Sequence, residues 1–288
     1  MKTLREYILE AKEKGVAIGH FNISNLEGLH GIVNAAVKLD LPVMIGVSSG
    51  EVAHVGVEEA VALVSALRKK HNHPIFLNAD HSHSYEAVKE MMDAGFDSVM
   101  FDASALGFEE NIKETKRVVE YARSLDRDII VEAEIGNIGT SSKIVDEIPE
   151  GVATDDSFLT SVEDAVRFVN ETGVDMLAPA IGNMHGMLKG KSNPRIDSDR
   201  VKEISDATGI PLVLHGGSGL VDEDFTKAIK NGMCVVHINT EIRIAFTESI
   251  KEAIEEDPNE ITPYKIMEES DEAVEEVVEK RLRLFNHL

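Results

Sequence analysis

The sequence is short of cysteine and of positive charge, and each shortage narrows the range of functions. Its single cysteine, Cys234, excludes an internal disulfide framework and is compatible with a reducing compartment. It has 29 Lys and Arg against 52 Asp and Glu, a formal net charge of -23, which argues against a nucleic-acid partner. Local phosphate sites built from lysines or backbone amides remain compatible with this charge.

Long apolar runs are also missing. No stretch approaches the roughly 20 apolar residues needed to cross a bilayer. The N-terminal segment 1–14 mixes Lys, Arg and Glu in a helical pattern and does not resemble a secretory signal. We therefore expect a soluble, cytoplasmic protein with no membrane partner.

Short apolar segments that alternate with helical patterns are abundant, and no linker-like change of composition divides them. The predicted strands are 16–21, 43–47, 75–80, 98–101, 128–134, 175–180, 211–214 and 235–238. The predicted helices include 24–39, for which Ser24 is the expected cap, and 57–70, 84–94, 109–124, 161–172 and 198–208, with two closing helices. This alternation predicts an α/β fold, a single (β/α)8 TIM-barrel domain over residues 1–288 with additional N-terminal and C-terminal helices. A doubly wound open sheet is the alternative.

Polar residues follow the ends of most predicted strands, and a barrel would gather them on one rim, where the active sites of such enzymes lie. They are Asn22, Ser48, Asp80, His81, Asp102, Glu134, His185, His215 and Asn239. Three histidines with one open position suit a catalytic zinc. Singly, each of His81, His185 and His215 is better explained as a hydrogen-bonded polar residue or a helix cap than as a ligand, but together they favour a metal. The remaining histidines, including His20, His54, His71 and His73, are interpreted as structural, and His83 is ambiguous.

Two segments rich in glycine and polar residues suggest further parts of a site. The long connection 136–156 is interpreted as a mobile lid, since loops of this length are often functional. The run His215-Gly-Gly-Ser-Gly219 is predicted to open a helix, so that its amides could approach a phosphate; a tight turn is the alternative. Asn239 and Thr240 would add donors from the eighth strand.

Six segments, taken together, resemble the class II, metal-dependent ketose-bisphosphate aldolases, and the resemblance spans nearly the whole chain. They are FNISNLE (21–27), ADH (79–81), SVMFD (98–102), VEAEIG (131–136), AIGNMHG (180–186) and LHGGSG (214–219). The resemblance implies a lyase of carbohydrate metabolism, such as glycolysis. It would reversibly cleave a ketose phosphate, such as fructose or tagatose 1,6-bisphosphate, to dihydroxyacetone phosphate and an aldehyde such as glyceraldehyde 3-phosphate.

The same resemblance implies roles for individual residues. His81, His185 and His215 would hold zinc, and Asp80 would exchange the proton of the substrate's C4 hydroxyl. A second divalent or monovalent cation would be held at secondary positions, namely Asp102 and Glu134. The predicted contacts to the sugar phosphate and its phosphate group are Asn22, Ser48, Gly186, Lys189, Gly216, Ser218, Asn239 and Thr240. Family members are usually homodimers or homotetramers, and the two C-terminal helices would form a dimer face or pack on the barrel wall.

The sequence departs from the family pattern at three places. His83 follows Asp80-His81, where the family commonly has Asp-His-Gly. The lid lacks a Gly-Gly followed by an acidic pair, so the enolising base is left among weak candidates, Glu147 and Glu150. His237 replaces an expected Asn, and the residues that stand where basic side chains would meet a distal phosphate are Glu268, Glu269, Asp271 and Glu272. The aldehyde partner is therefore expected to lack a phosphate or to carry another polar end.

Three alternatives remain at this stage. A Schiff-base aldolase needs a lysine at a strand end, and none of the predicted strands supplies one. A metal-dependent hydrolase would explain the His81-x-His83 pair, but that pair is expected on the first strand. A non-catalytic or re-specialised sugar-phosphate-binding barrel would explain the altered lid.

Overall fold

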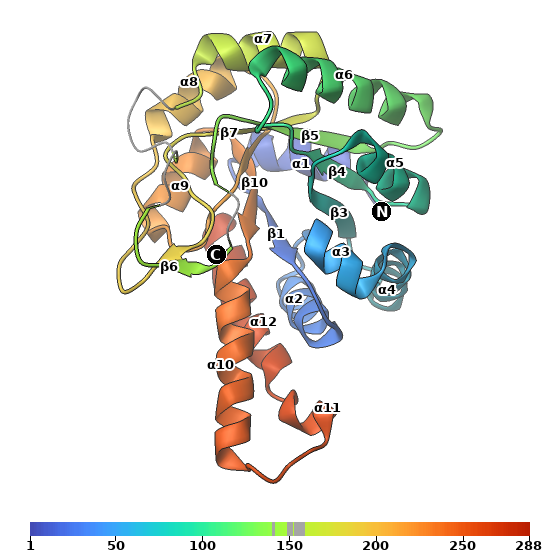
Figure 1. The fold of residues 1–288 in the computed structure, drawn as a ribbon, viewed down its shortest axis with the longest axis vertical. Helices are drawn as coiled ribbons and strands as arrows, with labels where there is room; N and C mark the ends of the chain where they lie inside the picture. Colours follow the sequence, from blue (N-terminus) through green and yellow to red (C-terminus); the bar gives the residue numbers. More distant parts are fainter. Residues whose placement is uncertain (140–141, 149–151, 153–158) are drawn as a thin grey trace.

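Eight parallel strands close into a barrel at the centre of the computed structural model, which describes residues 1–139, 142–148, 152 and 159–288 (Figure 1). Going round the barrel, the order is β1-β10-β9-β7-β5-β4-β3-β2. Their bounds are Ile18–Asn22 (β1), Val43–Ser48 (β2), Ile75–Ser82 (β3), Ser98–Phe101 (β4), Ile130–Ile135 (β5), Met176–Pro179 (β7), Leu212–Leu214 (β9) and Met233–Ile238 (β10). Because β1 pairs with both β2 and β10, the barrel prediction is confirmed and the open sheet is wrong.

Helices surround the barrel and carry the chain back between successive strands. They are Leu4–Lys14 (α1), Leu26–Leu39 (α2), Ser49–Val55 (α3), Val57–His71 (α4), Tyr85–Ala94 (α5), Phe108–Ser124 (α6), Val162–Thr172 (α7), Ser198–Thr208 (α8), Asp222–Lys230 (α9), Thr240–Glu256 (α10), Pro263–Ile266 (α11) and Ser270–Phe285 (α12). In the part of the chain that is described, no helix is both long and apolar enough to span a membrane.

Two predicted helix starts are wrong. Helix α2 begins after Asn25, not Ser24, because the Asn25 side chain accepts a hydrogen bond from the Gly28 N–H at 3.1 Å and so caps the first turn. Helix α9 begins at Asp222, so the glycines at 216–219 form a turn before it and do not belong to its first turn. The short helix α3 was not predicted, because seven residues carry too little periodicity to be recognised.

The segment interpreted as a lid contains regular structure. Strand β6 (Ile144–Val145) pairs in parallel with β8 (Met187–Leu188), and the pair forms a separate two-stranded sheet. The neighbouring residues 140–141, 149–151 and 153–158 lie outside the described part, and so does Glu150. The described portion of the segment is therefore tied to the second glycine-rich loop by backbone hydrogen bonds.

Helix α12 covers one side of the barrel. Val274, Val278, Leu282 and Phe285 are completely buried there. Gly31 on α2 allows the close approach, since a Cβ at this position would lie 2.4 Å from the Asp271 carbonyl oxygen. Packing on the barrel wall is thus the observed use of α12. Helix α10 instead extends away from the barrel towards α11 (Figure 1).

Candidate metal centre and active site

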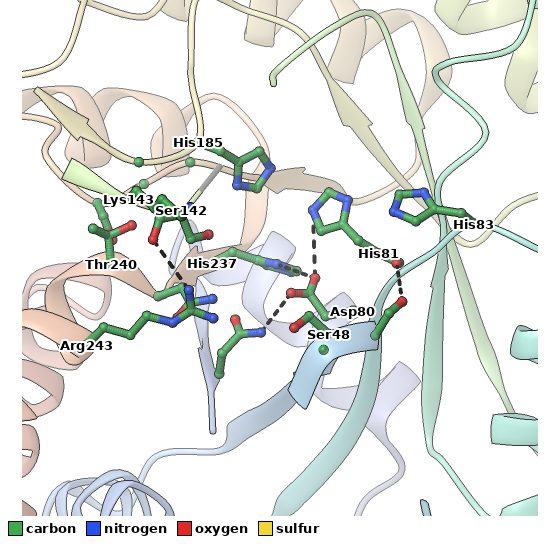
Figure 2. Close-up of a pocket in the computed structure, with 18 residues that line it drawn as sticks. Ser48, Asp80, His81, His83, Ser142, Lys143, His185, His237, Thr240 and Arg243 are labelled. Carbon is green, nitrogen blue, oxygen red and sulfur yellow. Dashed lines mark hydrogen bonds and ion pairs between the residues drawn. The ribbon is translucent and has the colours of Figure 1, made fainter. Parts of the chain in front are cut away.

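A cavity of about 500 Å³ opens at the C-terminal ends of the strands (Figure 2). It brings together Asp80, His81 and His185, which come from separate parts of the sequence. Most of the predicted substrate contacts line it too, namely Asn22, Ser48, Gly186, Gly216, Ser218, Asn239 and Thr240. The convergence expected from the strand ends is therefore present.

The end of β3 explains how two successive residues, Asp80 and His81, both face this cavity. Regular strand alternation would send them to opposite faces. Here the register between β3 and β4 shifts between Ala79 and Ser82, and His81 adopts a left-handed backbone with φ of 46°. Such irregularities re-aim side chains, and a non-glycine residue with positive φ often marks a functional site.

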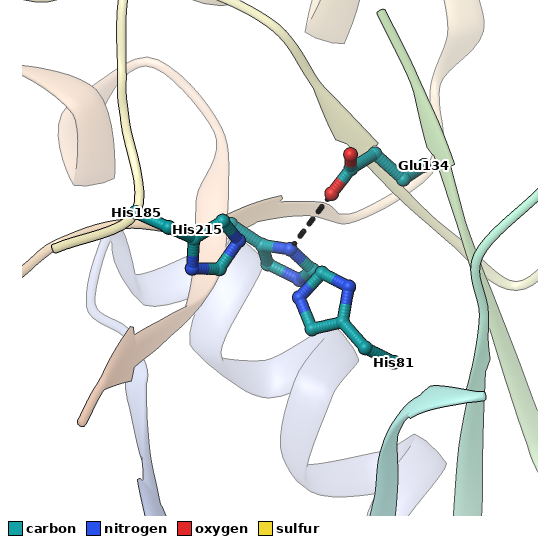
Figure 3. A group of neighbouring side chains, drawn as sticks. All are labelled: His81, Glu134, His185 and His215. Carbon is teal, nitrogen blue, oxygen red and sulfur yellow. Dashed lines mark hydrogen bonds and ion pairs between the residues drawn. The ribbon is translucent and has the colours of Figure 1, made fainter. Parts of the chain in front are cut away.

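The imidazoles of His81, His185 and His215 lie close together, as Figure 3 shows. The His81 ring centroid lies 4.8 Å from that of His185 and 4.9 Å from that of His215. The Nε2 atoms of His81 and His185 are buried and, among the described residues, have no hydrogen-bond partner. Buried nitrogens without partners are costly, so this cluster is suited to a ligand that accepts their lone pairs.

Asp102 orients His81. Its Oδ2 accepts a hydrogen bond from His81 Nδ1 at 2.9 Å, and its Oδ1 accepts from the Ser104 N–H and hydroxyl. Burial opposes ionisation of this carboxyl, yet the hydrogen bonds from His81 and Ser104 lower the pKa of Asp102 below its ordinary value. A carboxylate behind a histidine fixes the tautomer that leaves Nε2 free for a metal.

His215 lies between two glutamates from β5. Its Nε2 is 2.6 Å from Glu132 Oε1, and its Nδ1 is 3.1 Å from Glu134 Oε2. Burial would lower the pKa of His215, but the two carboxylates raise it well above its ordinary value. The two-residue period correctly places Glu132 and Glu134 on one face. To bind a metal, His215 has to give up one of these contacts.

A second cluster lies beside Asp80 and was not foreseen. The His20 and His237 rings stack with centroids 3.5 Å apart and planes 8° apart, and His237 Nδ1 lies 3.4 Å from Asp80 Oδ1. Burial lowers the pKa of His20 to about 4 and that of His237 well below its ordinary value. Gly46 makes room for His20, because a Cβ there would lie 2.2 Å from His20 Cε1.

His20, interpreted from the sequence as structural, is buried and hydrogen-bonded to Asn78, but it lies next to the site because it stacks on His237. The signal that could have shown it is the two-residue period along β1, which puts His20 on the same face as Asn22. His237 is the residue that replaces the expected Asn, and its closest polar group is the Asp80 carboxylate. For Asp80, burial would raise the pKa, but the charge of His81 and the polar contact with His237 keep it well below its ordinary value.

The glycine turn after β9 packs tightly. Gly216 has φ of 62°, and a Cβ there would lie 2.2 Å from the Met184 carbonyl oxygen. The helix that begins beside this turn is α10, whose first residue is Thr240, and the Glu241 N–H approaches Ser218 Oγ at 3.4 Å. The turn and the α10 N-terminus thus lie side by side at the same end of the cavity.

A few predicted residues lie elsewhere. Lys189 and Glu147 are exposed and are not among the lining residues. His83 does line the cavity, with its Nδ1 3.2 Å from the Asp102 carbonyl oxygen. Two cationic side chains that were not predicted, Lys143 and Arg243, also line it.

Comparison with known proteins agrees with this site. The family profile described as "Fructose-bisphosphate aldolase class-II" matches residues 2–288. A protein named fructose-bisphosphate aldolase from Staphylococcus epidermidis is 38% identical over 98% of this chain and 96% of its own length. A protein of the same name from Geobacillus stearothermophilus is 39% identical over the same shares of the two chains.

Solved structures point the same way. The YdjI aldolase from Escherichia coli K12 is 33% identical, with a TM-score of 0.81 over 98% of this chain and 96% of that one. A putative fructose-1,6-bisphosphate aldolase from Coccidioides immitis is 29% identical, with a TM-score of 0.84 over the same shares. This chain belongs to the class-II fructose-bisphosphate aldolase family, which consists of metal-dependent aldehyde-lyases acting on sugar phosphates.

Proposed function

We propose that this protein is a zinc-dependent aldolase that reversibly cleaves a ketose phosphate, such as fructose or tagatose 1,6-bisphosphate. The products would be dihydroxyacetone phosphate and an aldehyde, glyceraldehyde 3-phosphate or a relative of it. The observation that carries the proposal is the placement of His81, His185 and a buried carboxylate, Asp80, in one cavity at the barrel mouth, with His215 buried directly beside the two histidines.

The donor set fits a zinc ion. His81, His185 and His215 would hold it, because imidazole nitrogens are common zinc ligands and two of the Nε2 atoms here lack partners among the described residues. Glu134 lies within the same group of potential ligand atoms, all within 4.8 Å of one another, and Asp102 stands directly behind His81. These two carboxylates remain the candidates for a secondary cation site. When bound, zinc would polarise the ketone and stabilise negative charge on its oxygen.

The protein's own part of the cleavage is proton transfer by Asp80. Its carboxylate would accept the proton of the C4 hydroxyl while the C3–C4 bond breaks and C4 becomes an aldehyde carbonyl. The bonding electron pair stays with C3 of the dihydroxyacetone phosphate half, and a proton is added there afterwards. Glu147 and Glu150 stay the candidates for the group that exchanges this proton. The low pKa of Asp80 keeps the acceptor ionised at neutral pH.

The two sides of the cavity differ in chemistry. In Figure 2, Lys143, Thr240 and Arg243 lie to the left of Asp80, His83 lies to its right, and Ser48 lies next to Asp80. The first side would bind the phosphate of dihydroxyacetone phosphate, with Gly186, Gly216, Ser218, Asn239 and Thr240 as its cradle. Lys143 would supply there the positive charge expected from Lys189.

The side formed by Ser48 and His83 would take the aldehyde half. Its described residues offer hydroxyl and imidazole groups and no Lys or Arg side chain. This favours, as a second candidate, an aldolase whose aldehyde substrate carries hydroxyl groups but no phosphate. A re-specialised barrel that binds sugar phosphates without cleaving them is the remaining alternative.

The decisive experiment is a retro-aldol assay on a panel of ketose mono- and bisphosphates, with and without a chelator. We expect cleavage that follows the zinc content of the purified protein and disappears on chelation. Cleavage that survives the chelator but is abolished by borohydride trapping would contradict the zinc mechanism. Thermal shifts with sugar phosphates and no turnover on any panel member would support the binding alternative.

We also propose that residues 1–288 act as one domain and that the protein is a cytoplasmic homodimer or homotetramer. The exposed apolar side chains near α11, Ile261 and Tyr264, support a further contact surface there. Light scattering of the purified protein measures the oligomeric state directly.

A further inference from the structure

A buried carboxylate outside the predicted site, Glu51, is connected by hydrogen bonds to Asp80. Glu51 lies on the short helix α3 and is 6% exposed. It does not line the 500 Å³ cavity, but it lines an adjoining cavity of about 270 Å³. It therefore lies behind the wall of the candidate active site and not in it.

The fold of α3 aims this carboxylate at the strand ends. Glu51 is the third residue of the helix, and its Oε2 accepts a hydrogen bond from the backbone N–H of Ser48 at 2.8 Å. A glutamate at this position commonly turns back to the residue that precedes the helix. Its Oε1 accepts from Arg243 Nη2 at 2.7 Å, which holds the other oxygen.

The connection to Asp80 runs through Asn22. Its side-chain Nδ2 lies 2.8 Å from Glu51 Oε2 and 2.8 Å from Asp80 Oδ2. An ionised carboxylate can only accept hydrogen bonds, so two carboxylates on the same side require the Asn22 NH2 group there. Both hydrogens of that group are thereby used, and the Asn22 carbonyl oxygen is turned away from them.

This arrangement makes the two oxygens of Asp80 different. Oδ2 is held by Asn22, whereas Oδ1 has no hydrogen bond among the described residues and lies 3.4 Å from His237 Nδ1 and 4.0 Å from His81 Nε2. Oδ1 is therefore the buried oxygen of Asp80 that is left without a hydrogen bond and can still accept a proton.

We propose that Glu51 is a positioning residue, which fixes the Asn22 amide and through it the orientation of the Asp80 carboxylate. Arg243 supports Glu51 from the far side, and its Nη1 also reaches the Ser142 carbonyl oxygen at 3.4 Å. The proposal rests on the proposed role of Asp80. A small rotation of a reacting group lowers the rate of the chemical step more than it weakens substrate binding. We therefore expect loss of Glu51 to lower kcat.

The test compares Glu51→Ala and Glu51→Gln with the wild type in the retro-aldol assay. Glu51→Ala removes both acceptors, and we expect kcat to fall by about 30- to 100-fold, in the range typical of a misplaced catalytic group. Zinc content should be unchanged, since Glu51 contacts none of the three proposed histidine ligands. Glu51→Gln keeps an oxygen for Asn22, so it should restore kcat to within about fivefold of the wild type.

A double-mutant cycle tests the route. If Glu51 acts through Asn22, adding Glu51→Ala to Asn22→Ala should change kcat by less than about twofold. The full loss appearing again on the Asn22→Ala background would overturn the proposal, and so would a rise in KM with kcat unchanged in Glu51→Ala. Glu51→Met, which also removes both acceptor oxygens but keeps most of the side-chain volume, serves the same cycle if the alanine variant does not fold.

Asp175 provides a matched control. Its carboxylate, like that of Glu51, accepts from a backbone N–H and from arginine, here Val131 N–H, Arg5 and Arg123. Asp175 precedes β7 and lies at the opposite end of the barrel from the cavity, so Asp175→Asn should lower the melting temperature without changing kcat. A wild type that cleaves no ketose phosphate would defeat the proposed function; an active wild type with unaffected Glu51 variants would defeat only the role of Glu51.

Discussion

The two ends of the barrel are built from the same eight strands, yet they differ in almost every physical property. At the N-terminal end, α1 closes the barrel and packs Leu4 and Ile8 against Phe76, Met176 and other apolar side chains. At the C-terminal end, the interior holds histidines and carboxylates around an open cavity. In the described part of the chain, no buried polar side-chain atom at the first end lacks a hydrogen-bond partner, whereas several at the second end do.

The unpaired groups show where function lies. Among the described residues, six buried side-chain atoms have no hydrogen-bond partner, and all belong to the histidine and carboxylate clusters of the C-terminal end: His20 Nδ1, Asp80 Oδ1, His81 Nε2, Glu132 Oε2, His185 Nε2 and His237 Nε2. At the N-terminal end, Asp175 is held by Arg5 and Arg123 and by a backbone N–H. A stable protein tolerates unpaired buried atoms mainly where a ligand is to be bound.

Of the substitutions that test this difference between the two ends, removal of a metal ligand should have the largest effect on activity. His185→Ala is expected to abolish stoichiometric zinc binding and to lower kcat/KM by about 10³-fold or more, since a bound metal contributes several kcal/mol of transition-state stabilisation. Elemental analysis and the retro-aldol assay measure the two effects. His54→Ala, which removes an exposed histidine of α3, is the control and should change neither. Full activity in His185→Ala would remove the zinc centre from the mechanism.

Asp80→Asn should have the next largest effect. The substitution keeps the shape of the side chain but removes the proton acceptor, so kcat is expected to fall by about 10²- to 10⁴-fold, the usual contribution of general acid–base catalysis. Zinc content should be unchanged, because Asp80 is not one of the three proposed histidine ligands. A kcat within tenfold of the wild type would show that another group exchanges the C4 hydroxyl proton.

Much of the C-terminal end can be predicted from sequence because strand ends of a barrel must converge there. That rule alone brings Asp80, His81, His185 and His215 together without any knowledge of side-chain geometry. What it misses depends on local backbone detail. The irregular end of β3 turns His81 into the cavity, contrary to the regular alternation of a strand. No pattern in the sequence predicts this irregularity.

Other residues were missed because their elements are short or their partners are distant in sequence. Glu51 lies on a seven-residue helix, and its contact with Arg243 joins residues 192 positions apart. The two-residue period of β1 predicts that His20 lies on the same face as Asn22. Its stacking on His237, however, depends on the space left by Gly46 in a neighbouring strand. The packing at the N-terminal end is easier to predict from the sequence, because it requires only knowing which face of each strand and of α1 is apolar.

A truncation at the N-terminal end should separate stability from activity. Ile8 is 2% exposed under the barrel, and Ile8→Ala is expected to lower the free energy of unfolding by about 2–4 kcal/mol through lost burial and an incompletely filled cavity. The kcat of the folded fraction should stay unchanged, because the substitution is at the end opposite the cavity. Urea unfolding measures the first quantity. The control is Leu9→Ala, which removes a half-exposed side chain of the same helix.

Cys234 gives the smallest and most local test of the closed end. The thiol is buried in the apolar layer under the barrel, and burial raises its pKa from 9.0 to about 11. Below pH 9 the thiol is neutral in both the folded and the unfolded protein. Between pH 9 and 11 it ionises only in the unfolded protein, so its contribution to stability is lost as the pH rises through this window.

We expect iodoacetamide to label the native protein slowly at pH 8 and the urea-unfolded protein quickly. Cys234→Ala should show a shallower loss of stability between pH 9 and 11 than the wild type. Fast labelling of the native protein would mean that the N-terminal end opens to solvent as readily as the active-site end, and the contrast between the two ends would then be one of composition alone.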